Sequence, residues 1–191
     1  RKKMLKDYKE SKQTIENDRV VLKTMVVEHA TDIKEWLELD EIYTYWGRKA
    51  TSGEKNPEAM FKKRNTTLDF RWSVILKENN KVIGELQVLD IVNCRMGDIA
   101  YRFNPQYWNQ GIATESLLAV INFIFTKTEM KRLNANADVR NVASNRVLEK
   151  CGFTKEGTVR QGKMVSTYCD YNIYRLIYED VSKNSVYNKK R

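Results

Sequence analysis

A predicted strand that leads directly into a long amphipathic helix is the feature that most constrains the fold of this chain. Residues 98–104 read as a strand that ends at Pro105, and from Gly111 to about Phe125 apolar residues recur at spacings of three and four. Gly111 and Ala113 are small, so the first N–H groups of this helix stay accessible. Together with the Thr114 hydroxyl, these N–H groups predict a site for an anion such as a phosphate or diphosphate.

The remaining periodic segments place this unit in a larger sheet. Residues 71–77 and 81–91 read as a hairpin around Glu78–Asn80, and Gly152 ends a short helix. The other predicted strands are residues 19–25, 133–139, 154–159 and 167–177, and the predicted helices are 30–39, 111–125 and 143–151. Strands in mixed order with helices on both sides indicate an α/β (α+β) fold.

Length and charge favour one domain with charged ends. A chain of 191 residues predicts a single domain. Residues 1–19 contain seven Lys/Arg and four Asp/Glu, and residues 182–191 contain four Lys/Arg and no acidic residue, so the ends carry +7 of the net +9. We therefore expect a charged N-terminal extension (1–17), a domain (18–181) and a basic tail (182–191). Solvated tails are the simpler interpretation, with weak nucleic-acid contact through them as the alternative.

The sequence also limits location and chemistry. It has no apolar run of the roughly 20 residues that a membrane span needs and no secretory signal, so we expect a soluble, cytoplasmic protein. Three cysteines at Cys94, Cys151 and Cys169 match no disulfide or zinc framework. A single histidine, His29, argues against a His-based triad or metal site, and we expect no metal.

A second motif, NVASNRVLEKCGF, follows the strand at 133–139. Asn141 at its start can offer an amide to a ligand, or it can simply cap the following helix.

Two stretches, FNPQYWNQGIATESLLAVINFIF and NANADVRNVASNRVLEKCGF, together resemble the acyl-CoA-binding core of the GNAT-type N-acetyltransferases. The branch that includes ribosomal-protein N-terminal alanine acetyltransferases is the most similar. NDRVVLKTMVVEHATDIKEWLEL and KENNKVIGELQVLDI resemble the first strand and helix and the central hairpin of that branch, so the resemblance spans about residues 18–178. It implies a mixed, mostly antiparallel twisted sheet flanked by helices, with a splay between the fourth and fifth predicted strands, 98–104 and 133–139.

The resemblance implies acetyl-CoA as the co-substrate, with no metal and no covalent enzyme intermediate. The diphosphate would lie on the loop, and the pantetheine arm would lie in the splay, next to Asn141. Many family members carry Gln or Arg where this chain has Trp108. A backbone N–H near Phe103 or Asn104, where the family strand has a bulge, would polarise the thioester carbonyl. The loop residues are Asn109, Gln110, Gly111, Ile112, Ala113 and Thr114.

The acid and the base follow less directly from the resemblance. Many GNAT proteins use a Tyr where this chain has Leu148, and the resembled branch uses a Ser that corresponds to Ser144, which could equally cap the helix. Lys163 occupies the position where that branch can carry a Glu. Asp98 and Glu85 are substitutes that would act as a base through water, or they are solvated surface carboxylates.

The resemblance implies a primary amine as the acceptor, in a pocket for which several aromatic residues are candidates. A protein α-amine with a pKa near 8 is roughly one-tenth neutral at pH 7, far more than a lysine amine, which favours an N-terminal peptide. A small amine, an antibiotic or a catalytically silent acyl-CoA-binding module stays open, as do monomer and homodimer. We expect Cys151 to pack rather than react. The aromatic candidates are Tyr43, Tyr45, Trp46, Trp72 and Tyr168.

Overall fold

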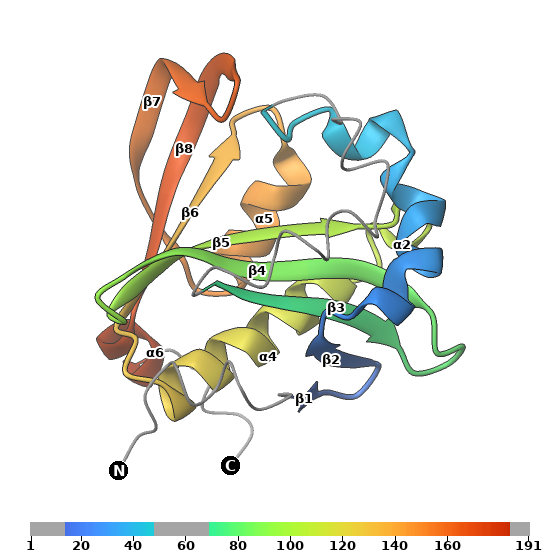
Figure 1. Ribbon diagram of the computed structural model, residues 1–191. Helices are drawn as coiled ribbons and strands as arrows, with labels where there is room; N and C mark the ends of the chain where they lie inside the picture. Colours follow the sequence, from blue (N-terminus) through green and yellow to red (C-terminus); the bar gives the residue numbers. More distant parts are fainter. Residues whose placement is uncertain (1–13, 48–68, 184–191) are drawn as a thin grey trace.

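A computed structural model of the protein describes residues 14–47 and 69–183 (Figure 1). The strands of this part form one sheet in the order β1-β2-β3-β4-β5-β6-β8-β7. They are β1 (Thr14–Glu16), β2 (Val20–Thr24), β3 (Phe70–Leu76), β4 (Val82–Val92), β5 (Met96–Phe103), β6 (Arg132–Asp138), β7 (Thr154–Met164) and β8 (Thr167–Ile177). The α-helices are α2 (Ala30–Leu37), α4 (Ile112–Lys127), α5 (Val142–Lys150) and α6 (Tyr178–Lys183), with 3-10 turns η1 (Val27–His29), η2 (Asp40–Tyr43) and η4 (Pro105–Tyr107).

Every strand and helix that the periodicity predicts is present, so the mixed, mostly antiparallel sheet with flanking helices is confirmed. One strand and one α-helix were not predicted. β1 pairs with β2 inside the segment 1–17 that we assigned to an extension, and α6 follows β8. Most of the charged ends, residues 1–13 and 184–191, lie outside the described residues.

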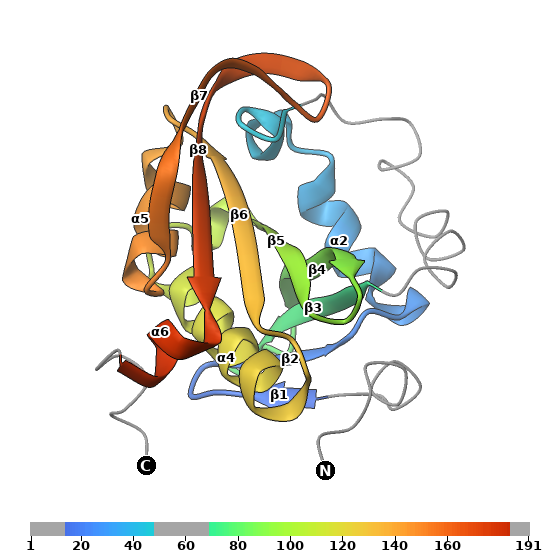
Figure 2. The ribbon, with the colours of Figure 1, turned by 90° about the vertical axis from the view of Figure 1, so that its left-hand side faces the viewer.

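The predicted splay is present between β5 and β6. These neighbours are parallel, and their pairing stops after Met96–Arg132, Gly97–Leu133 and Asp98–Asn134. Every other neighbouring pair in the described sheet is antiparallel. Beyond Asp98 the two strands separate, and Figure 2 shows them diverging. Because β1 was not predicted, the splay lies between the fifth and sixth strands of the observed sheet.

Helices cover the two faces of the sheet unequally, as Figure 2 shows. On one face α4 and α5 pack on the main hydrophobic core, where Leu117, Ile121 and Ile124 of α4 are fully buried. On the opposite face α2 buries Ile33 and Trp36 against β3 and β4. The splay therefore opens between a helix-covered face and a face that α2 covers only at one end.

No helix within residues 14–47 and 69–183 is long and apolar enough to cross a membrane.

Candidate active site

The N-terminus of α4 has no side-chain cap. Gly111 occupies the N-cap position and has no side chain that could accept a hydrogen bond from the first turn. Its carbonyl accepts from the N–H of Glu115, but the N–H groups of Ile112, Ala113 and Thr114 precede the first helical bond. By contrast, Asn141 caps α5 with its own side chain. Three N–H groups at the positive end of α4 are thus available to an anion.

The loop before α4 has a conformation suited to anion binding. Asn109 has φ +59° and Gly111 has φ +77°, so two residues of this short loop are left-handed. Such alternation turns successive N–H groups to one side and forms a concave anion site. The sequence identified Gly111 for its small size but did not predict the left-handed Asn109.

Arg19 braces this loop from the start of β2. Its guanidinium donates to the carbonyl of Gln110 (3.0 Å) and forms an ion pair with Glu115 (2.7 Å), and its own N–H donates to the same carboxylate (2.9 Å). Arg19 lies 96 residues before Glu115 in the chain, and the sequence analysis did not identify it.

Trp108 fixes the end of β5 to the loop. Its indole N–H donates to the carbonyl of Phe103 at 2.8 Å, while 42% of the residue stays exposed. Phe103 buries its ring in the core, and Asn104 accepts from the N–H of Gln106 through its side chain. Trp108 therefore holds the carbonyl at the end of β5 in place.

The two main-chain donors proposed for a carbonyl oxygen differ in availability. The N–H of Asn104 donates to the carbonyl of Ile83 at 2.8 Å, so Asn104 is already paired. Bonding alternates along an antiparallel pair, so the N–H of Phe103 points away from β4, toward the splay. The expected bulge at this position is absent, because the register is continuous from Gly84–Phe103 to Leu89–Asp98 and shifts only beyond it. The bulge prediction was wrong. Of the two N–H groups, only that of Phe103 is directed away from β4 and toward a ligand in the splay.

The open edges of β5 and β6 face each other across the splay. By the same alternation, Tyr101 and Phe103 turn their N–H groups toward β6. Just after β6, the N–H of Val139 donates to the carbonyl of Asp170 in β8, so the same alternation along β6 directs the backbone of Asn136 toward β5. Within the described residues no strand pairs with these groups. A polar, extended ligand could pair with them as an added strand.

The first turn of α5 is held tightly beside the splay. The side-chain oxygen of Asn141 accepts from the N–H of Ser144 (3.1 Å), so the capping role is confirmed, and its amide nitrogen has no partner among the described residues. Asn145, which is buried, donates to the carbonyls of Asp138 (2.9 Å) and Asn141 (2.8 Å) and accepts from Tyr174 (2.8 Å). These bonds fix the end of β6 to α5 and β8.

Ser144 meets a residue that sequence reasoning missed. The hydroxyl of Tyr101 on β5 lies 2.9 Å from Ser144 Oγ and 3.3 Å from its carbonyl oxygen. Burial raises the pKa of Tyr101 well above its usual value near 10, although the bond to Ser144 opposes this, so the phenol stays protonated. No sequence signal links these residues, which lie 43 positions apart.

Glu85 is not the solvated surface carboxylate that we considered. It is fully buried opposite Arg102 on β5 and pairs with its guanidinium, with Nε 2.7 Å from the carboxylate. Arg102 in turn lies 4.6 Å from the centre of the Trp46 ring and 5.8 Å from that of Tyr43. This cluster lies on the face opposite α4 and α5.

Asp98 is the more accessible of the two candidate bases. It is half-buried at the last paired position before the splay, where the amide of Asn134 donates to its carboxylate at 3.0 Å. Arg132 holds Asn134 from the other side at 2.6 Å. Lys163 is exposed near the outer end of β7, paired with Tyr168 of β8.

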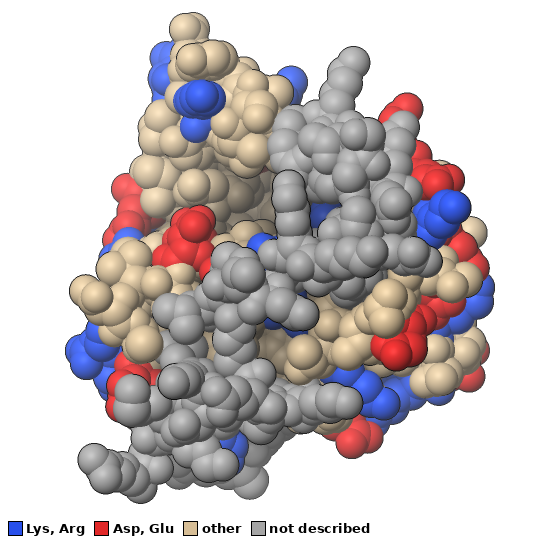
Figure 3. Space-filling model, in the orientation of Figure 1, with Lys and Arg blue, Asp and Glu red and all other residues tan. Residues whose placement is uncertain are grey.

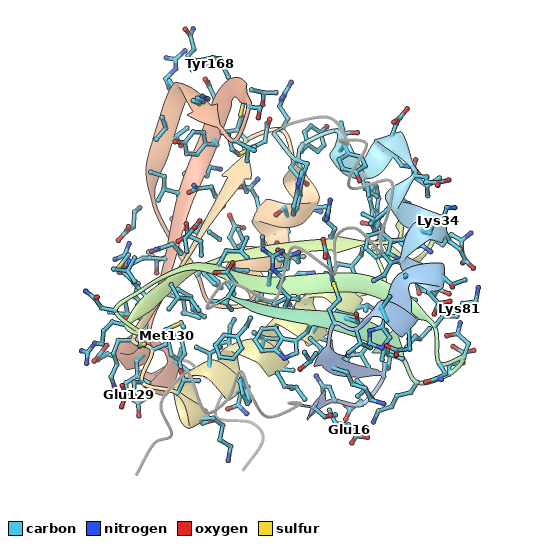
Figure 4. All side chains as sticks on the ribbon, viewed as in Figure 1. Glu16, Lys34, Lys81, Glu129, Met130 and Tyr168 are labelled. Atoms are coloured by element: carbon cyan, nitrogen blue, oxygen red, sulfur yellow. The ribbon has the colours of Figure 1, made fainter. Side chains whose placement is uncertain are left out.

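The aromatic candidates divide between core and surface. Trp72 is 1% exposed and stacks on Phe70 with ring centres 5.2 Å apart, so it is core. Tyr43 is buried and donates to the carbonyl of Leu37, whereas Tyr168 is 75% exposed at the tip of the β7–β8 hairpin (Figure 4). Only Tyr45 and Trp46 lie partly open beside the Arg102 cluster and the end of β6.

Other reactive side chains play packing roles. Cys151 is buried, its pKa is raised by that burial to about 12, and its thiol donates to the carbonyl of Thr114 (3.6 Å). All three cysteines are free, and no metal-ligand cluster occurs in the described part of the chain.

On the face in Figure 3, Lys and Arg lie among Asp and Glu rather than in one basic patch.

Comparison with known proteins gives one family. A family model described as an acetyltransferase (GNAT) domain matches residues 19–154. The uncharacterized N-acetyltransferase YoaA of Bacillus subtilis is 27% identical over 172 residues, which cover 85% of this chain and 96% of that protein. Two solved structures share the fold. The ribosomal-protein-S5-alanine acetyltransferase of Vibrio fischeri has a TM-score of 0.78 at 21% identity, covering 88% of this chain and 98% of that one. The spermidine N-acetyltransferase of Vibrio cholerae, in complex with CoA and spermine, has a TM-score of 0.76 at 17% identity, covering 86% and 98%.

Proposed function

Because the chain belongs to the GNAT family of acetyltransferases, we propose that it binds acetyl-CoA at the head of α4 and in the splay, and acetylates a primary amine. The observation that carries the proposal is the uncapped start of α4 beside two strand edges that no other strand of the described residues pairs with. The first feature suits a diphosphate, and the second suits the amides of a pantetheine arm. Asn141, through its amide nitrogen, is the proposed side-chain contact to that arm.

Bound acetyl-CoA would supply the acetyl thioester, and this chain's residues would supply hydrogen bonds and a base. The N–H of Phe103 is the main-chain donor directed into the splay, and Ser144 is the hydroxyl at its helix-covered side. Asp98, at the closed end of the splay, is the proposed base acting through water. Glu85 is the weaker choice because a buried guanidinium already holds its carboxylate.

A protein N-terminal α-amine is the acceptor that we propose. Its pKa near 8 leaves roughly a tenth neutral at pH 7, so it needs little help from a base such as Asp98, which is half-buried and accepts a hydrogen bond from the amide of Asn134. A polyamine is the second candidate, because a spermidine N-acetyltransferase shares this fold. Weak contact of the basic ends with RNA remains a separate proposal that salt-dependent binding would test.

The test measures thiol release from acetyl-CoA against N-terminal peptides, polyamines and aminoglycosides, with CoA binding followed by calorimetry. We expect CoA binding and acceptor-dependent thiol release that is fastest with a peptide. Binding without turnover on any amine would instead support an acyl-CoA-binding module. Failure to bind CoA would refute the proposed site.

A further inference from the structure

Two hydroxyl groups from opposite walls of the splay meet at hydrogen-bond distance. Tyr101 belongs to β5, three residues beyond the last position that pairs with β6. Ser144 belongs to the first turn of α5, which follows β6 directly. Their oxygens are 2.9 Å apart, so the pair bridges the strand and the helix where the strands have separated.

The two hydroxyls are not equivalent as donors. Although burial raises the pKa of Tyr101, a phenol is still a stronger acid than an aliphatic alcohol, and so the better donor. When Tyr101 donates to Ser144 Oγ, the hydroxyl hydrogen of Ser144 remains available to donate to a different acceptor. The carboxamide of Asn141 fixes the backbone of Ser144 at the same time, so the serine is held from both ends.

From this arrangement we infer that Tyr101 is a positioning residue that directs the Ser144 hydroxyl to the leaving sulfur of the thioester. The inference rests on the proposed function and extends it to a residue outside the cofactor loop and the α5 motif. Ser144 makes the hydrogen bond to sulfur, and Tyr101 acts through Ser144. Leu148, where many family members have a Tyr, is 1% exposed and apolar, so it offers no alternative donor.

The surroundings of Tyr101 support a role for its hydroxyl beyond packing. Its ring packs against the main core, a requirement that phenylalanine would meet equally well. The hydroxyl nevertheless bonds to Ser144, and its pKa is raised by desolvation, so it stays a neutral donor across the working pH range. A donor that cannot ionise keeps Ser144 oriented at every pH where the thiol titrates.

The experiment compares Tyr101→Phe, Ser144→Ala and the double variant with a matched control, Tyr174→Phe. Tyr174 also carries a buried hydroxyl bonded to α5, through Asn145 Oδ1 at 2.8 Å, but it lies on the β8 side. Three quantities are measured for each protein: kcat and KM for acetyl-CoA, the melting temperature, and the thiol pKa of bound CoA by ultraviolet titration of the thiolate.

We expect bound CoA to have a thiol pKa about one unit below the free value near 8.5, because a hydroxyl bonds to the charged sulfur. Tyr101→Phe and Ser144→Ala should each remove this shift and lower kcat about tenfold or more, as loss of a positioned donor does, with KM nearly unchanged. The double variant should lose no more than Ser144→Ala, and Tyr174→Phe should keep the thiol pKa shift, with any fall in kcat following its fall in melting temperature.

Two results would overturn the inference alone while the wild type remains active. One is a Tyr101→Phe protein with wild-type kcat and thiol pKa. The other is a loss of kcat that matches that of Tyr174→Phe and follows the fall in melting temperature, since that indicates a packing role. An inactive wild type that binds no CoA overturns the proposed function, and this inference falls with it.

Discussion

Two substitutions at Gly111 separate two requirements for CoA binding at the loop before α4. One is the left-handed backbone at Gly111, and the other is the absence of negative charge near the diphosphate. Within residues 14–47 and 69–183, a Cβ added at Gly111 would meet only Arg19 Nη2, at 3.5 Å, which is an ordinary contact. Gly111→Ala therefore introduces no clash, and its cost is that of a left-handed non-glycine residue, about 1–2 kcal/mol. If the loop relaxes to avoid that strain, CoA affinity falls by about 5- to 30-fold.

Gly111→Glu adds a negative charge to the same backbone change. At about 5 Å and an effective dielectric constant of about 20, repulsion from one phosphate charge is about 3 kcal/mol, and solvent and the neighbouring Arg19 reduce it. We expect Gly111→Glu to bind CoA at least about tenfold more weakly than Gly111→Ala at low salt, with a gap that narrows as salt is added.

Calorimetric titration with CoA at several salt concentrations measures both effects. The matched control is Gly157→Glu, which places the same charge on β7, where an added Cβ meets no described residue within 4 Å. This control should bind CoA as the wild type does. Equal affinities for Gly111→Ala and Gly111→Glu at low salt would refute the placement of the diphosphate on this loop.

Three further predictions concern the surrounding structure. Arg19→Ala should raise the KM for acetyl-CoA up to about fivefold while changing the free energy of unfolding by less than about 1 kcal/mol, because the Arg19 side chain is 48% exposed; an unchanged KM would show that the loop needs no brace. Arg102→Met should lower the free energy of unfolding by about 3–5 kcal/mol in urea denaturation, because it removes the guanidinium that pairs with buried Glu85, and a wild-type value would contradict this. Burial lowers the pKa of His29, so the native state binds fewer protons than the unfolded state and stability should fall as pH drops below about 6.5; His29→Gln should flatten that part of the curve, and an identical pH dependence would exclude His29 as its source.

Local patterns were sufficient for most of the architecture. Hydrophobic periodicity predicted β4, β5 and α4 within a few residues, because strand and helix repeats are properties of short segments. β1 has only three residues, so it has no periodicity to detect, and its pairing with β2 is a tertiary event. The left-handed Asn109 was missed for a similar reason, since asparagine permits that conformation without requiring it.

The side-chain partners of the site were beyond the reach of local patterns. Glu85 and Arg102 are 17 residues apart and meet only because the β4–β5 register sets them opposite each other. Trp72 and Trp46 look alike as aromatic candidates, yet one is in the core and the other lies beside Arg102.

By itself, the sequence determined the order of the strands and helices from β2 to β8, the glycine at the head of α4 and the family resemblance, because each is encoded in contiguous residues. Only the tertiary structure decided which strand edges stay unpaired, which main-chain N–H faces the splay and which hydroxyl reaches Ser144. Those features depend on strand register and on how α5 packs across β5 and β6, and a distance such as 2.9 Å between Tyr101 and Ser144 exists only once distant segments have been brought together.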